Sequence, residues 1–313
     1  MIKSIIHFIR RISPFNNDTE MSKAEFVVKK LLGFVLVYGV AAVVGEAVVI
    51  GVLTAMGYDP LHGVMPDGAL MELMSFGGFA VFGAAALIYC RLVEKRDPAA
   101  LGLLPRKVPE HILGGSLAVA LLLVIAVICC LTGAMSFEGF SGKVGIRDLI
   151  LFFFAFIIQG AAEEIICRGF LMTSLRQKLS LPAAVNINAA VFILLHMMGT
   201  DILGMGAGYA VCGIVNLYLI SVIFSLLAAR RENLWIACGL HSVWNFLLYC
   251  IMGIDLSGNE SSEGVLLFNV HKANIINGGE YGLEAGLACT AALGVTAVIL
   301  IAAKKGGDKN GVQ

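Results

Sequence analysis

The sequence predicts an all-α fold, a polytopic membrane helix bundle of about eight transmembrane helices with both termini cytoplasmic. Composition is the first observation, because 58% of the 313 residues are hydrophobic, 14% are charged and mean hydropathy is +0.88. Soluble domains of ordinary composition are less apolar. The other two observations are apolar runs of membrane-spanning length and the uneven distribution of Lys and Arg between them. The formal net charge of +0 indicates no nucleic-acid partner.

Apolar runs of roughly 20 residues are long enough to cross about 30 Å of hydrocarbon as helices. Eight such stretches are expected to span the membrane: 31–56, 71–91, 112–135, 148–172, 182–199, 203–229, 233–253 and 283–303. Mostly short connections join them, and a longer polar segment, 254–282, precedes the last. We expect a single transmembrane domain over 31–303, a cytoplasmic or interfacial segment over 1–30 and a cytoplasmic tail over 304–313. Membrane lipids are therefore expected partners.

The basic residues predict the orientation. With both termini in the cytoplasm, cytoplasmic segments hold 18 of the 22 Lys and Arg residues, the outer side holds Lys143, Arg147 and Lys272, and Arg168 lies within a span. Cytoplasmic loops of membrane proteins carry such an excess of positive charge. The compact loops and the absence of targeting motifs lead us to expect a bacterial plasma membrane.

Two glutamates and an arginine occur together in one predicted span, within GAAEEIICRGF at 160–170. Glu164 and Arg168 are four residues apart, so they share a helix face and can neutralise each other inside the bilayer. Glu163 points about 100° away from Glu164 around the helix. Its carboxylate is left without this partner and is a candidate proton acceptor from water. Gln159, one turn before Glu163, is a candidate supporting residue.

Two histidines occur in later predicted spans, His196 at the end of FILLH and His241 at the start of HSVWN. Glu163 and His196 both lie about 21 to 24 Å from the turn that joins their spans, so they can meet. His241 and Asn245 are four residues apart and share a face, although the predicted depth of His241, about 15 Å, agrees less well. Ionisable side chains inside a membrane mark functional sites. We expect a water-activating hydrolytic site, reached by water from the cytosol.

Other interpretations of these residues remain open. Buried ionisable groups can form the proton or ion path of a transporter or channel, although the spans show no paired broken helices and no inverted repeat. A noncatalytic immunity or scaffold protein could retain the same residues. We assign Cys167, on the face of Glu163, to packing, and we leave Glu46 in the first span unexplained.

The segments GAAEEIICRGF, FILLH and HSVWN resemble the motifs EExxxR, FxxxH and HxxxN/D of the CPBP family, the CAAX protease and bacteriocin-processing intramembrane proteases. This family includes the type II CAAX prenyl endopeptidases. The resemblance covers about 150–255, and it implies a catalytic core over about 148–255 whose cavity opens between helices toward one side of the membrane.

The resemblance also implies residue roles for an intramembrane endopeptidase. Glu163 would polarise the attacking water, His196 would help to position it, and His241 and Asn245 would stabilise the oxyanion. Glu164 and Arg168 would hold the architecture of the site.

The cofactor prediction is either none or a divalent metal, since Glu163, His196 and His241 could form a three-ligand zinc site. The implied substrate is a peptide or protein, either prenylated or a bacteriocin-like precursor, and no residue selects between these two.

Overall fold

The computed structural model describes residues 8–16, 20–66, 68–105, 107–258, 260–261, 264–271 and 274–303. Its α-helices are α2 (Lys23–Ala55), α3 (Ala69–Gly78), α4 (Ala80–Leu92), α5 (Val108–Leu131), α6 (Ile146–Glu164), α7 (Thr173–Leu175), α8 (Leu181–Gly199), α9 (Ala207–Arg231), α10 (Trp235–Phe246) and α11 (Leu287–Ala302). Two π-helical segments, Ile165–Met172 and Leu247–Ile251, continue α6 and α10. Short 3₁₀ turns are Pro60–His62, Pro98–Leu101, Gly279–Tyr281 and Leu283–Ala285.

The predicted all-α membrane bundle is confirmed. Among the described residues, six helical segments are long and apolar enough to cross a membrane: Lys23–Ala55, Leu70–Leu92, Val108–Leu131, Ile146–Leu175, Leu181–Gly199 and Ala207–Arg231. Two shorter apolar helices, Trp235–Ile251 and Leu287–Ala302, coincide with the last two predicted spans. The predicted domain boundaries remain predictions, and residues 1–7 and 304–313 of the terminal segments lie outside the described residues.

The first helix begins before its apolar run does. Ser22 caps α2 by accepting a hydrogen bond from the backbone of Glu25, while the Glu25 carboxylate accepts one from the backbone of Ser22. This reciprocal capping satisfies amide groups that a helix start otherwise leaves unpaired. The polar first turns of α2 are therefore helical, although hydropathy placed the start of this span at residue 31. Glu46 is exposed on α2, outside the cavity described below.

A small sheet was missed by the sequence analysis. Strands β1 (Met135–Phe140) and β2 (Leu266–Val270) pair antiparallel, with an irregularity between Phe137 and Gly139. β2 lies in the segment that the sequence predicted to be a polar connection. The two strands are far apart in sequence, and the contact between the rings of Phe137 and Phe268 joins them at a centroid distance of 5.5 Å.

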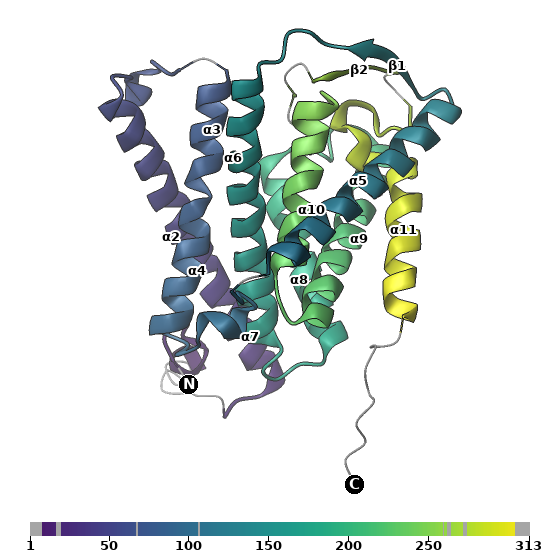
Figure 1. Ribbon diagram of the computed structural model, residues 1–313. Helices are drawn as coiled ribbons and strands as arrows, with labels where there is room; N and C mark the ends of the chain where they lie inside the picture. Colours follow the sequence, from purple (N-terminus) through teal and green to yellow (C-terminus); the bar gives the residue numbers. More distant parts are fainter. Residues whose placement is uncertain are drawn as a thin grey trace.

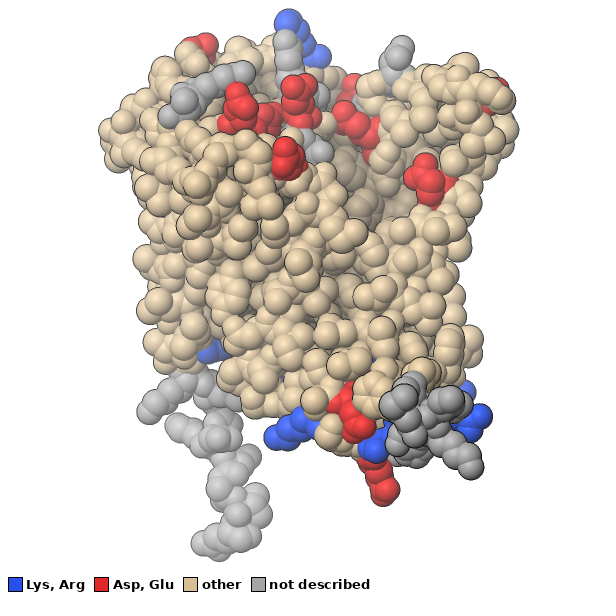
Figure 2. Space-filling model, turned by 180° about the vertical axis from the view of Figure 1, so that it is seen from behind, with Lys and Arg blue, Asp and Glu red and all other residues tan. Residues whose placement is uncertain are grey.

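The ends of the bundle differ in charge. α2 begins and α11 ends at the same end, which we call the lower end, and the β1–β2 sheet lies at the opposite, upper end (Figure 1). On the face shown in Figure 2, Lys and Arg gather mainly at the lower end and acidic side chains mainly at the upper end. This distribution agrees with the predicted orientation, which itself remains a prediction.

Close helix packing fixes α10 in the centre of the bundle. A Cβ atom added to Gly239 would overlap the backbone of His111 on α5, and one added to Gly114 would overlap the backbone of Ile236 on α10. On the other side, a Cβ added to Gly160 of α6 would lie 2.6 Å from Ser242 Oγ. Glycines let helix backbones approach this closely in membranes. They hold α10, which carries His241 and Asn245, against both α5 and α6.

Candidate active site

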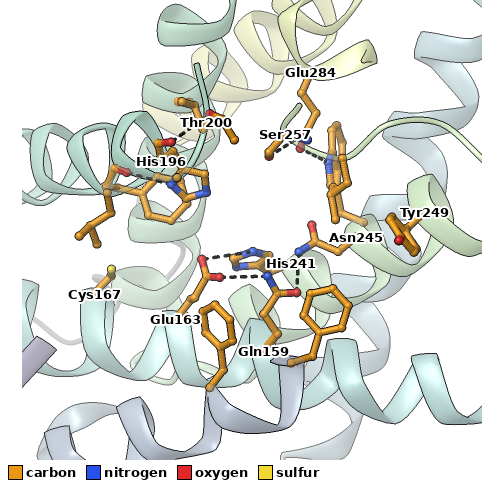
Figure 3. Close-up of a pocket in the computed structure, with 18 of the residues that line it drawn as sticks. Gln159, Glu163, Cys167, His196, Thr200, His241, Asn245, Tyr249, Ser257 and Glu284 are labelled. Carbon is orange, nitrogen blue, oxygen red and sulfur yellow. Dashed lines mark hydrogen bonds and ion pairs between the residues drawn. The ribbon is translucent and has the colours of Figure 1, made fainter. Parts of the chain in front are cut away.

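The predicted catalytic residues line one cavity of about 610 Å³. Glu163 on α6, His196 on α8, and His241 and Asn245 on α10 all contribute to its wall, as does Gln159 (Figure 3). Three helices that are separated in sequence thus deliver these side chains to one space. Phe76, Phe79 and Phe82 add apolar side chains to the lining.

Glu164 and Arg168 lie behind the cavity wall, with both side chains fully buried. The Arg168 guanidinium donates to Glu164 Oε1 at 2.9 Å and to the Ser221 hydroxyl of α9 at 2.8 Å. Its charged group lies 4.4 Å from the ring centroid of Phe192 and 5.0 Å from that of Phe224. Aromatic faces stabilise a desolvated cation. The predicted pairing of Glu164 with Arg168 is therefore confirmed, and it links α6 to α8 and α9.

His241 lies between the two glutamates, which the sequence analysis did not predict. Its Nδ1 is 2.9 Å from Glu164 Oε1, and its Nε2 is 3.8 Å from Glu163 Oε2. An ionised carboxylate can only accept a hydrogen bond, so Nδ1 carries the hydrogen in this contact. The ring is oriented with Nε2 toward Glu163 and is stacked on Phe224 at a centroid distance of 5.0 Å. Glu164 therefore accepts hydrogen bonds from both His241 and Arg168.

A short chain of amides orients Glu163. The Gln159 amide donates to Glu163 Oε1 at 3.2 Å, and Asn245 Nδ2 donates to Gln159 Oε1 at 3.3 Å (Figure 3). The Glu163 side chain keeps 18% exposure, whereas Glu164 has none. Glu163 is thus the carboxylate of this pair that solvent reaches, as its helical position suggested.

His196 lines the same cavity through separate contacts. Its Nδ1 donates to the backbone carbonyl of Phe192 at 2.9 Å, and its ring packs on Phe192 at a centroid distance of 4.2 Å. A neutral ring that donates from Nδ1 leaves Nε2 as an acceptor. Within the described part of the chain, no hydrogen bond or ion pair joins His196 to Glu163 or His241. The structure therefore brings His196 to the cavity but not into direct contact with the proposed base.

Both helices that carry the acidic and amide residues change to π-helix directly after the site. The π-helical segment Ile165–Met172 follows Glu163 and Glu164, and Leu247–Ile251 follows Asn245. Such wide turns are rare and occur frequently at functional sites. The motif spacing indicated an ordinary helix, so only the structure reveals them.

The segment containing this geometry also matches a protein family. Residues 145–247 match the family model described as type II CAAX prenyl endopeptidase Rce1-like. Over these residues, which we call the Rce1-like segment, the chain is similar to this family. The match confirms the family resemblance found in the three motifs, and it includes all seven predicted site residues, from Gln159 to Asn245. No curated protein matches the chain.

The divalent metal that we considered stays a prediction. The part of the chain that the structure describes contains no group of three His, Cys, Asp or Glu side chains placed to hold a metal ion. Glu163, His196 and His241 share the cavity, but His196 is directed by its bond to Phe192. In the described residues these three side chains do not form a complete ligand group, so a three-ligand zinc site is not assigned here.

Glu284, outside the Rce1-like segment, is a cavity residue that the motifs did not identify. Its Oε1 accepts from Trp244 Nε1 at 2.9 Å, and its Oε2 accepts from the backbone and hydroxyl of Ser257 at 2.7 Å. Trp244 immediately precedes Asn245 on α10. Glu284 therefore connects α10 to the segment at the upper end of the cavity. A charged residue inside the last predicted span, 283–303, was the available sequence signal.

The cavity opens at the upper end, which conflicts with the expected access from the cytosol. Its lining includes Glu72 near the start of α3, Thr200 just after α8, and Ser257 and Glu260 beyond the end of α10. These positions are all at the end opposite the start of α2 and the end of α11. Cytoplasmic termini and a cytosolic opening were predicted together, and this fold does not allow both. Cys167 also lines the cavity, with 1% exposure that agrees with a packing role.

Proposed function

We propose that this protein is an intramembrane endopeptidase that hydrolyses a peptide bond with a water molecule activated by Glu163. The observation that carries the proposal is the position of Glu163. It is the solvent-reached carboxylate of a buried pair, lies 3.8 Å from His241 Nε2, and lines a cavity inside a membrane bundle. The match of residues 145–247 to an endopeptidase family supports the same reaction class. We further propose a bacterial plasma membrane as its location.

In the proposed mechanism, Glu163 accepts a proton from water as the water oxygen attacks the carbonyl carbon. His196 Nε2, left as an acceptor, helps to orient that water. Asn245 Nδ2 has two hydrogens, of which one is donated to Gln159, so the other can be donated to the oxyanion. The proton held by Glu163 then passes to the leaving nitrogen as the carbon–nitrogen bond breaks.

His241 has two uses in this mechanism. When Nε2 is protonated it can donate to the oxyanion, and its position beside Glu163 lets it take part in the proton transfer to the leaving amine. The bond from Nδ1 to Glu164 fixes the ring in the orientation that both uses need. Arg168 neutralises Glu164, so this orienting carboxylate is stable without solvent.

The test compares membranes that contain the wild-type protein with membranes that contain Glu163→Gln, using proteomics of intact and cleaved polypeptides. One precursor, prenylated or bacteriocin-like, should accumulate in the variant and be cleaved by the purified wild type. Normal processing by folded Glu163→Gln protein would overturn the proposal. Metal analysis of the purified protein, with cleavage measured before and after chelation, tests the metal-dependent form separately.

A further inference from the structure

The open end of the cavity is defined by residues from several elements. Ser75 lies in the second turn of α3 and is exposed, and Glu260 is exposed in the segment that follows α10. Thr200 follows α8, which runs upward from the lower end. Figure 2 shows a hollow at the upper end, with acidic side chains around it. Solvent therefore reaches Glu163 from this end.

The lower end of the same site is closed by tightly packed side chains. Arg168, Phe170 and Leu175, which follow Glu163 toward the lower end, have no exposed surface. Leu101 is also fully buried and Leu234 is 2% exposed, and both contact Gly169 closely enough that an added Cβ would lie within about 4 Å of each. Protein interiors packed in this way leave no room for water or a peptide to pass.

The connections at the closed end carry the positive charge. Lys95 and Arg96 follow α4, Arg176 and Lys178 follow α7, and Arg231 ends α9. Lys and Arg in short loops remain on the cytoplasmic side during insertion of a membrane protein. The closed end of the site is therefore directed toward the cytoplasm, and the open end toward the other side.

From these observations we infer that the cavity takes its substrate from the non-cytoplasmic side of the membrane. The substrate class is a polypeptide segment that has already reached that side, either exported or anchored with its cleavage site near the outer surface. This identification of a substrate depends on the proposed function, but the direction of the opening does not. A prenylated C-terminus made in the cytosol would meet the closed end, so this class of substrate is disfavoured.

Cysteine labelling in intact cells or spheroplasts tests the direction of the opening. Of the eight cysteines, only Cys130 is exposed, so Cys130→Ala provides a background in which the remaining cysteines are buried. Ser75→Cys and Glu260→Cys report on the cavity, and Gln177→Cys, an exposed position after α7, is the matched control at the lower end. The probe is a membrane-impermeant maleimide, applied with and without permeabilisation of the membrane.

We expect Ser75→Cys and Glu260→Cys to be labelled severalfold above the Cys130→Ala background in sealed cells, and Gln177→Cys only after permeabilisation. The reverse pattern would overturn the inference, as would labelling of the two cavity positions only after permeabilisation. If one of the two cavity variants misfolds, the other still reports on the cavity. Labelling requires no catalysis, so this result stands whether or not the protein proves to be an endopeptidase.

The location of the substrate is tested with the precursor that accumulates with Glu163→Gln. Protease added outside intact cells should digest that precursor, while a cytoplasmic protein in the same cells should survive. A precursor that is protected until the membrane is opened would contradict the inferred substrate class. Absence of any precursor would count against the proposed function and would leave the labelling result unchanged.

Discussion

His241 Nδ1 and Glu164 Oε1 form a 2.9 Å contact between residues 77 positions apart in the sequence. This contact joins α10 to the end of α6, and it places a histidine between a neutralised carboxylate and a solvent-reached one. The catalytic proposal depends on this arrangement, because the same carboxylate that Arg168 stabilises also sets the orientation of the ring.

Glu163→Gln should reduce cleavage by at least about 100-fold, the lower range for loss of a general base. Glutamine has nearly the same shape and can still accept from Gln159, so the fold should be preserved. The measurement is the initial rate of cleavage of the identified precursor by purified protein, with the melting temperature as the control. An unchanged rate in a folded sample would remove Glu163 from the role of base.

Arg168→Met should destabilise the folded protein by about 3 to 5 kcal/mol, because it leaves Glu164 buried without its partner. The double variant Glu164→Gln with Arg168→Met should recover part of this loss, since no unpaired charge then remains. Unfolding in detergent measures the stability of both variants. Equal stabilities of wild type and Arg168→Met would show that the pair has no structural importance.

Features that depend on residues close together in the sequence were predicted, whereas features that depend on contacts between distant segments were not. Spans and the Glu164–Arg168 pair follow from local hydropathy and from spacing of four residues along one helix, so both were predicted correctly. The His241–Glu164 contact depends on how α10 crosses α6. Counting residues from the turns gives the depth of a side chain in the membrane, but it does not give this crossing. β1 and β2 pair across more than 100 residues, and the side on which the cavity opens depends on the packing of several elements.

Glu284→Gln should lower stability by about 1 to 3 kcal/mol, the range for buried groups that lose a charged partner. It should also change the fluorescence of Trp244, whose indole donates to Glu284. Glu260→Gln is the matched control, because Glu260 lines the cavity but is exposed. Identical emission spectra and stabilities for the two variants would contradict the proposed connection between Glu284 and α10.

Glu94, just beyond α4, should make stability depend on pH. Burial alone would raise the pKa of this carboxyl, but Lys30 and hydrogen bonds from Lys30, Ser174 and Arg96 lower the pKa below its ordinary value of 4.5. A lowered pKa means that the unfolded state binds the proton more tightly. The stabilisation is therefore fully present above pH 4.5 and is lost as pH falls through the lower, folded-state pKa.

Glu94→Gln should be less stable at neutral pH and should lose less stability than wild type on acidification below pH 4.5. Glu138→Gln, an exposed change on β1, provides the control and should retain the wild-type pH dependence. The measurement is the free energy of unfolding in detergent at a series of pH values. Parallel curves for wild type and Glu94→Gln would show that the Glu94 carboxyl does not contribute to the pH dependence of stability.

The glycine contacts around α10 also limit how the cavity can change its size. Because Gly114 and Gly239 bring the backbones of α5 and α10 together, rotation of α10 would force main-chain atoms to collide. The part of the lining that comes from α3 and α4 is different, since it consists of the side chains of three phenylalanines, Phe76, Phe79 and Phe82. We therefore expect the cavity to widen for a bulky chain by rotation of these phenylalanine side chains, while His241 and Asn245 keep their positions on α10.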